Sequence, residues 1–305
     1  MSYHIVNIDS PQCSLSCPDG QLICKTAAGE KRLPLEDVAA IIITSFSATI
    51  HSSLLLQAAQ HGVALILCEK FKPVSLVLPA NRATDTLLTR AHIRLYPAIT
   101  AQLWQKTVDA KCQNQFALAN HIAPDDPALN RLQGVAFGRQ LHKEAACAKL
   151  FWMILARTIP AHDFIRGRFQ GGLNNLLNYG YAVLLSIVLQ KLFGVGLDPT
   201  FGISHVTRER STPLAYDLME PFRPCVDWRV LQWVRQHPNK QDWVVSKEFR
   251  KWVTAFPVEK IAYAGYRLET RNCIEGVVRS FRRAVLAGRP ALYKPWTPRS
   301  SKWAG

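Results

Sequence analysis

Glu144, His205, Asp217 and Glu220 are the residues whose types and spacing best suggest chemistry. Glu144 opens the stretch EAACAKLFW, His205 lies in GLDPTFGISHV, and LAYDLMEPFRPCVD contains the other two. The surrounding sequence is apolar and helix-like. A histidine with several carboxylates is a ligand set for a divalent metal ion. We therefore expect a metal site in the second half of the chain.

Glu144 also has an ordinary explanation. In a helix its face would carry Ala148 and Trp152, which are apolar. A carboxylate on such a face needs a partner, because burying an unpaired charge is costly. A salt bridge to Lys149 or to a nearby arginine would supply one without any metal.

Asp217 and Glu220 lie three residues apart, so one helix face can present both. A histidine in the preceding loop, His205, could converge with them on one ion. Alternatively, Asp-x-x-Glu is a capping box at a helix start. Pro221, directly after Glu220, makes such a start awkward but allows a kinked helix to continue.

Several polar residues near these acids are candidates for contacts with phosphate. Arg223 could neutralise a carboxylate or grip a phosphate with two hydrogen bonds. Asn178 and Tyr179 follow Gly171-Gly172 in a predicted helix start, where amides suit phosphates but equally serve capping and packing. Arg166 and Arg168 lie just upstream, where the default explanation is solvated surface charge.

The charge balance favours a polyanionic partner. The 305-residue chain has a net charge of +15 and a pI near 9.7. From Arg223 to Gly305 it has 17 Lys/Arg and 6 Asp/Glu, a net +11. Nucleic acid is the first candidate and an acidic membrane surface the second. The C-terminal part is the expected place for phosphate contacts.

Composition indicates a globular protein of the cytoplasm. The start, MSYHIVNIDSPQ, lacks a charged region followed by an apolar one, so we expect no secretory signal. Tyr181–Leu197 is apolar but interrupted by Gln190 and Lys191, which favours a buried core helix and no membrane. Cys13, Cys17 and Cys24 lack a second Cys/His pair, so reduced thiols are expected rather than zinc.

The elements that would position these residues indicate an α+β fold. Short apolar or alternating runs punctuated by proline and glycine predict strands near the N-terminus. They are Tyr3–Ile8, Gln21–Lys25, Val38–Thr44, Val63–Cys68 and Val74–Leu78, with a helix at Ser52–His61. Helical spacing follows at Leu87–Tyr96, Ala101–Asn120, Leu129–Ile159 and Leu173–Phe193, and Thr212-Pro213 predicts a further helix start.

This pattern predicts four regions. A small β-rich domain spans 1–80 and a linker spans 81–88. A larger α-helical catalytic domain spans 89–290, and a basic, flexible tail spans 291–305.

Several stretches of the sequence, taken in their order along the chain, resemble the family of CRISPR-associated protein 1, the integrase of spacer acquisition. PLEDVAAIIIT and HGVALILCEKFKPVSLVLP resemble its β domain, and LWQKTVDAKCQNQ resembles the first large-domain helix. The Glu144 helix, LNYGYAVL, GLDPTFGISH and YDLMEPFRP then follow in the family's order. LNYGYA together with DLMEPFRP is most similar to the type II form.

The resemblance implies roles for individual residues. Glu144, His205 and Glu220 would be metal ligands, and Asp217 matches an additional acid near them. Tyr216 matches a position beside the substrate in some relatives. Ser204 departs from the pattern, because many type II relatives have a second histidine there.

The resemblance also implies a reaction and partners. A 3′-hydroxyl of prespacer DNA would attack a phosphodiester at the repeat boundary of the CRISPR array, with Mg²⁺ or Mn²⁺ as cofactor. The expected partners are double-stranded DNA, a second copy in a homodimer for which the β-rich domain at 1–80 is the dimerisation domain, and CRISPR-associated protein 2 in a heterohexamer. A type II effector is a further candidate. The alternatives are a structure-selective nuclease or mobile-element integrase of the same fold, and a DNA-binding scaffold without catalysis.

Overall fold

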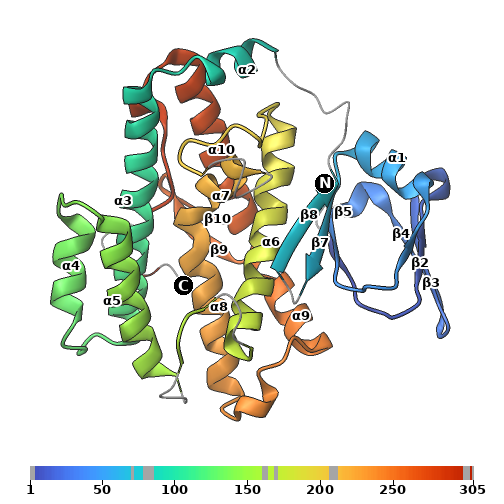
Figure 1. The fold of residues 1–305 in the computed structure, drawn as a ribbon. Coiled ribbons are helices and arrows are strands. Elements are labelled where there is room, and N and C mark those ends of the chain that lie inside the picture. Colours follow the sequence, from blue (N-terminus) through green and yellow to red (C-terminus); the bar gives the residue numbers. More distant parts are fainter. Residues whose placement is uncertain are drawn as a thin grey trace.

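The computed structural model describes residues 4–69, 72–77, 86–159, 164–167, 171–205, 212–297 and 303. Figure 1 shows a small β-rich N-terminal region beside a larger helical region. The predicted α+β fold class is confirmed.

A four-stranded sheet with strand order β1-β5-β7-β8 joins the two regions. β5 pairs in parallel with β1 and β7, whereas β8 is antiparallel to β7. All six residues of β5 are buried, because Ile42 faces the helical core and Ile41 and Ile43 face the β core. The strands are β1 (His4–Ile8), β5 (Val38–Ile43), β7 (Ala64–Glu69) and β8 (Lys72–Val77).

A second sheet closes the β core with strand order β4-β3-β2-β6. Cys13 and Cys17 pack into this core with Leu15 and Leu35. Helix α1 (Ser52–His61) has the predicted bounds and ends at Gly62, whose φ of 66° is left-handed. The strands are β2 (Ser14–Ser16), β3 (Gln21–Thr26), β4 (Gly29–Pro34) and β6 (Thr49–Ile50).

The helical region begins with α2 (Thr86–Ile93), which starts within the predicted linker and extends beyond it, and with α3 (Pro97–Ile122). The single helix predicted over Leu129–Ile159 is wrong. It is divided into α4 (Leu129–Phe137) and α5 (Lys143–Thr158). At Gly138 a Cβ would lie 2.5 Å from the carbonyl oxygen of Gly134, and α5 restarts only after His142 at a φ of 55°.

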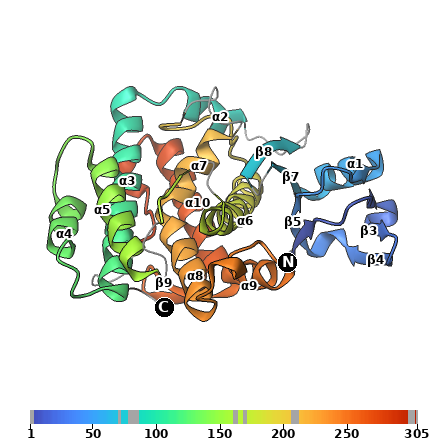
Figure 2. The ribbon, with the colours of Figure 1, turned by 60° about the horizontal axis from the view of Figure 1, so that its bottom comes forward.

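Helix α6 (Leu173–Gly194) is the centre of the molecule. It packs against the first sheet and against α7, α8 and α10, and Figures 1 and 2 both show it between them. It is the one helix among the described residues that is long and apolar enough to cross a membrane, but 78% of its most apolar window is buried inside the protein. We interpret it as the core helix that its sequence predicts.

The remaining elements follow α6. A hairpin of β9 (Lys260–Tyr263) and β10 (Tyr266–Glu269) interrupts the helices and was not predicted; Ala264 and Gly265 turn it with φ values of 49° and 99°. The helices are α7 (Pro213–Met219), η3 (Glu220–Phe222), α8 (Arg223–Gln236), η4 (Lys240–Asp242), α9 (Lys247–Thr254), η5 (Phe256–Val258), α10 (Thr270–Ala287) and η6 (Pro290–Leu292).

The flexible tail predicted from residue 291 is wrong for residues 291–297. Tyr293 and Trp296 are fully buried. Trp296 stacks on Phe222 at 5.6 Å, and Asn114 of α3 donates a hydrogen bond to its carbonyl at 3.0 Å. The aromatic side chains that seemed to mark a loose tail instead complete the helical core.

Candidate active site

Glu144 and Glu220 meet on one buried cation, the ammonium group of Lys111. Lys111 Nζ lies 2.6 Å from Glu144 Oε1 and 2.6 Å from Glu220 Oε2. The three side chains come from α5, η3 and α3. The Lys111 side chain is 12% exposed and that of Glu220 4%, whereas Glu144 is 37% exposed. The two carboxylates thus share one cation at a site that opens to solvent beside Glu144.

Neighbouring charges keep these groups ionised. Burial raises the pKa of Glu220, but the charges of Arg223, Lys111 and His205 outweigh burial and lower it to about 2. Burial lowers the pKa of Lys111, yet Glu220 and Glu144 raise it overall. Arg223 Nε lies 2.8 Å from Glu220 Oε1. The site therefore holds a carboxylate and an ammonium at neutral pH.

The kink at Pro221 positions Glu220. The chain passes from α7 into η3 without an N-cap, and Asn114 donates to the Pro221 carbonyl at 2.7 Å. Glu220 thus points toward α3 and α5. Asp217 does not form a capping box within its own helix, since its carboxylate accepts hydrogen bonds from the preceding loop.

Asp217 orients His205. Its Oδ1 lies 2.7 Å from His205 Nδ1, and its oxygens also accept backbone N–H groups of Ile203, Ser204 and His205. With Nδ1 as the donor, Nε2 carries the lone pair that a metal ion needs. The Asp217 side chain is fully buried. Asp217 therefore fixes the orientation of the His205 ring.

Close packing of the loop also requires Gly202. A Cβ at this position would lie 2.5 Å from the His205 carbonyl oxygen and 2.9 Å from Asp217 Oδ2. Around the His205 ring lie Trp104 at 6.0 Å and Tyr216 at 6.2 Å between ring centroids. The loop that carries the histidine is therefore tightly specified.

The donor chemistry fits a hard divalent cation. Two carboxylates converge on a positive charge, and an imidazole lies close enough to Glu220 to affect its pKa. Glu220 Oε2 is buried and lacks a hydrogen bond of good geometry despite the nearby Lys111. As the side chains stand, no three His, Cys, Asp or Glu residues of the described ranges are grouped closely enough to hold a metal ion. Lys111 is the group that lies between the carboxylates.

The predicted phosphate contacts have different environments. Arg166 donates to Asn174 Oδ1 at 2.7 Å and to Asn178 Oδ1 at 3.1 Å, so two predicted DNA contacts bind each other. The Arg166 guanidinium also lies over Trp152 and Tyr181. Arg168 lies outside the described residues.

Tyr179 does not fit its predicted role. It is fully buried and packs edge-on against Phe249, so it cannot touch DNA as the protein stands. Its side chain leaves α6 on the face that the core covers, which helical spacing alone did not reveal. Tyr216 and Arg223, by contrast, lie beside His205 and Glu220.

Two parts of the site were missed from the sequence. Lys111 lies on the same face of α3 as the buried residues Thr107 and Asn114, four residues after the first and three before the second. This helical spacing was the sequence signal that could have identified Lys111 as a buried cation. The second part is a buried pair behind Arg223. Tyr181 Oη donates to Asp227 Oδ1, and the Arg223 guanidinium lies 4.7 Å from the centre of the Tyr181 ring.

Comparisons with known proteins match most of this chain. The family model described as CRISPR associated protein Cas1 matches residues 6–256. A Neisseria meningitidis protein named CRISPR-associated endonuclease Cas1 is 32% identical over 277 residues, covering 89% of this chain and 88% of that protein. A Francisella tularensis subsp. novicida protein named CRISPR-associated endonuclease Cas1 1 is 27% identical over 287 residues, covering 86% of this chain and 89% of that protein.

Solved structures show the same fold. A CAS1 protein from Thermotoga maritima superimposes with a TM-score of 0.76 at 17% identity, covering 94% of this chain and 98% of that one. A casposase bound to integration product gives 0.73 at 20% identity, covering 98% and 93%.

Proposed function

This chain belongs to the Cas1 family of CRISPR-associated proteins, and from that premise we propose that it is a metal-dependent DNA integrase and endonuclease. It joins prespacer DNA to the CRISPR array through attack of a 3′-hydroxyl on a phosphodiester at the repeat boundary. The convergence of Glu144 and Glu220 on one cation, beside a histidine oriented by Asp217, carries the proposal. The names of the relatives, and a fold shared with a casposase bound to integration product, support it.

Each side chain has a role in this reaction. Glu144, Glu220 and His205 would hold Mg²⁺ or Mn²⁺, which supplies charge stabilisation at the attacked phosphate and its leaving oxygen. Asp217 keeps His205 in the tautomer with its lone pair on Nε2. Arg223 keeps Glu220 ionised. Lys111 neutralises both carboxylates and would have to leave the space between them for a metal ion to be held there.

The partners follow from the same premise. We propose double-stranded DNA, both prespacer and leader-repeat, as substrate. The fold is also shared with 36% of a chain in a Cas6-RT-Cas1–Cas2 complex. We therefore propose assembly with CRISPR-associated protein 2 in a heterohexamer, in which a dimer of that protein bridges two homodimers of this chain. A type II effector is a further candidate partner, and the cytoplasm is the proposed location.

A strand-transfer assay tests the proposed function. A labelled duplex with 3′-hydroxyl ends is mixed with a supercoiled plasmid that carries a leader and repeat, with CRISPR-associated protein 2, in Mn²⁺ or EDTA. We expect metal-dependent transfer of label to the repeat. Glu144→Ala, His205→Ala and Glu220→Ala should abolish transfer, whereas Asp242→Ala, at an exposed acid, should not.

The other outcomes separate the alternatives. Cutting without joining at the repeat would indicate a nuclease, and joining without preference for the repeat would indicate a mobile-element integrase. DNA binding with no metal-dependent reaction would indicate a scaffold. Full transfer by all three alanine variants would refute the assignment of the site.

A further inference from the structure

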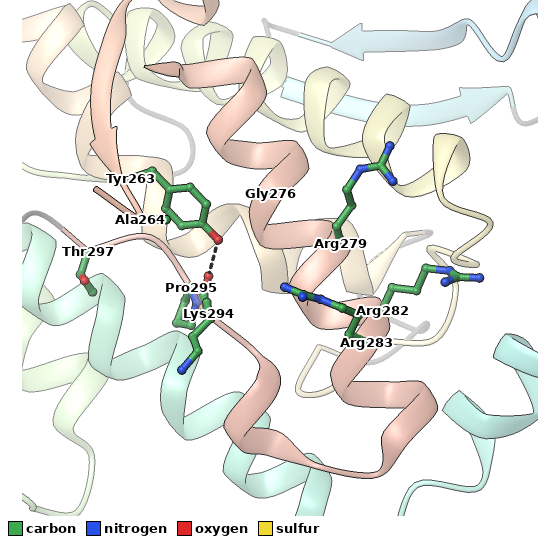
Figure 3. A pocket seen from close by; sticks show the side chains of 9 residues that line it. All are labelled: Tyr263, Ala264, Gly276, Arg279, Arg282, Arg283, Lys294, Pro295 and Thr297. Carbon is green, nitrogen blue, oxygen red and sulfur yellow. Dashed lines mark hydrogen bonds between the residues drawn. The ribbon is translucent and has the colours of Figure 1, made fainter. Parts of the chain in front are cut away.

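A second polar feature lies apart from the candidate active site, where α10 faces the β9–β10 hairpin and the segment after η6. Together they enclose a hollow of about 840 Å³ (Figure 3). This volume lies within the range of ligand-binding pockets. None of the residues that line it belongs to the site around Lys111.

Positive charge gathers around this hollow. Arg279 and Arg283 lie one turn apart on α10, and Lys294 lies on the opposite wall. In Figure 3 Arg283 extends from α10 toward the segment with Lys294, and its charge acts on Tyr263. Arg282 also lines the hollow but donates to the Val195 carbonyl. No carboxylate is among the lining residues.

Glu275 of α10 pairs with Arg279 through both its Nε and an Nη, but this one carboxylate is shared by two cations and offsets only part of the positive charge. Glu275 bonds Arg279 at 2.8 Å but also bonds Lys191 of α6 at 3.0 Å. Lys106 of α3 lies close enough to Lys294 for that charge, together with burial, to lower the pKa of Lys106. Positive side chains held this close together repel one another, and this favours the binding of an anion between them.

The floor of the hollow is apolar and aromatic. Tyr263 lies against Gly276, where a Cβ would approach the ring to 2.6 Å, so only glycine allows this packing. Tyr263 Oη donates to the Lys294 carbonyl at 3.0 Å, which fixes the ring (Figure 3). Pro295 and Ala264 complete the floor. An aromatic ring beside a row of cations is the arrangement that binds single strands, through base stacking and phosphate contacts.

We propose that this hollow binds a single-stranded segment of DNA, with a base against Tyr263 and phosphates at Arg279, Arg283 and Lys294. The proposal rests on the proposed function, since an unpaired end or flap of the substrate would supply the strand. An acidic peptide would use the cations but would leave the aromatic floor without a role.

Fluorescence anisotropy of labelled dT12 in EDTA tests the proposal, with a blunt duplex as the second probe. Arg279→Gln/Arg283→Gln should lower dT12 affinity at least about tenfold, because each lost contact is a charge-assisted one. The slope of log K against log salt should fall by about 1.4 for two cations. Arg131→Gln/Arg139→Gln, which removes two exposed arginines in and after α4, is the matched control.

A second pair of variants tests the aromatic floor. Tyr263→Leu should lower dT12 affinity about fivefold or more through lost stacking. Tyr263→Phe keeps the ring, loses the hydrogen bond to Lys294, and should bind as the parent does. Unfolding temperatures of all variants verify that they fold.

Three results would overturn the proposal. They are equal losses in the α10 and α4 double variants, an equal loss for blunt duplex and dT12, and competition by oligoglutamate as effective as that by unlabelled dT12. The anisotropy assay measures neither strand transfer nor metal binding. Failure of the integrase proposal would be seen instead in the strand-transfer assay with the alanine variants of the active site.

Discussion

Replacing Asp227 by asparagine should remove a large part of the pH dependence of stability above pH 5. Asp227 is 2% exposed and accepts a hydrogen bond from Tyr181. Burial raises its pKa from 3.8 to about 7, and the hydrogen bond and the charges of Arg166 and Arg223 only partly offset this rise. The folded protein therefore binds this proton more tightly than the unfolded chain does.

The sign and size of the effect follow from linkage. An acid with a raised pKa in the folded state favours folding at low pH, and this contribution is lost as the pH rises from 3.8 to about 7. One pH unit corresponds to about 1.36 kcal/mol, so the whole loss is about 4 kcal/mol, of which about 2.5 kcal/mol falls between pH 5 and pH 8. Asparagine retains an acceptor for Tyr181 but cannot ionise.

Urea unfolding at pH 5 and pH 8, in EDTA, measures this effect. Asp227→Asn should gain about 2.5 kcal/mol relative to the parent on going from pH 5 to pH 8. Asp242→Asn, at an exposed acid of η4, is the control and should show no comparable gain. An equal stability difference between parent and Asp227→Asn at the two pH values would refute the reasoning.

Three further predictions concern the site and the buried C-terminal segment. Lys111→Met should destabilise the metal-free protein by about 3 kcal/mol, because two carboxylates lose a buried partner; thermal unfolding with and without Mn²⁺ should show the loss largely restored by the ion, and a loss equal in both would contradict the shared-cation arrangement. Asp217→Asn should weaken Mn²⁺ binding about 10- to 100-fold in calorimetry through loss of His205 orientation; unchanged affinity would exclude that role. Trp296→Ala should cost about 3 to 5 kcal/mol in urea unfolding, whereas a cost below 1 kcal/mol, as expected of a loose tail, would contradict its burial.

Local sequence patterns were sufficient to predict a helix or strand where that element buries a continuous apolar face. The apolar run at Val38–Thr44 predicts a strand, and β5 lies there because both its faces are covered. Ser52–His61 predicts α1 because Gly62 supplies the left-handed residue that ends it. The polar strand β4 and the short strands of the β9–β10 hairpin have no such apolar pattern, because pairing with their partner strands determines them.

The candidate ligands were recognisable by residue type, but their relation to one another was not. Glu144, His205 and Glu220 stand out because acids and a histidine are unusual in apolar helical sequence. Lys111 joins two of these acids across 33 and 109 residues of chain. No local spacing reports such a contact, because it depends on how α3, α5 and η3 pack.

The same reason explains the errors at Tyr179 and in the C-terminal segment. Tyr179 lies on the buried side of a helix that is covered over most of its length, so its polar hydroxyl did not indicate exposure. Trp296 looked like part of a loose basic tail, yet it stacks on Phe222 from 74 residues earlier in the chain. Residue type and periodicity specify which groups can be buried or can bind an ion. Which of them meet is decided by the packing of distant segments, where the free energy of burial exceeds local preference.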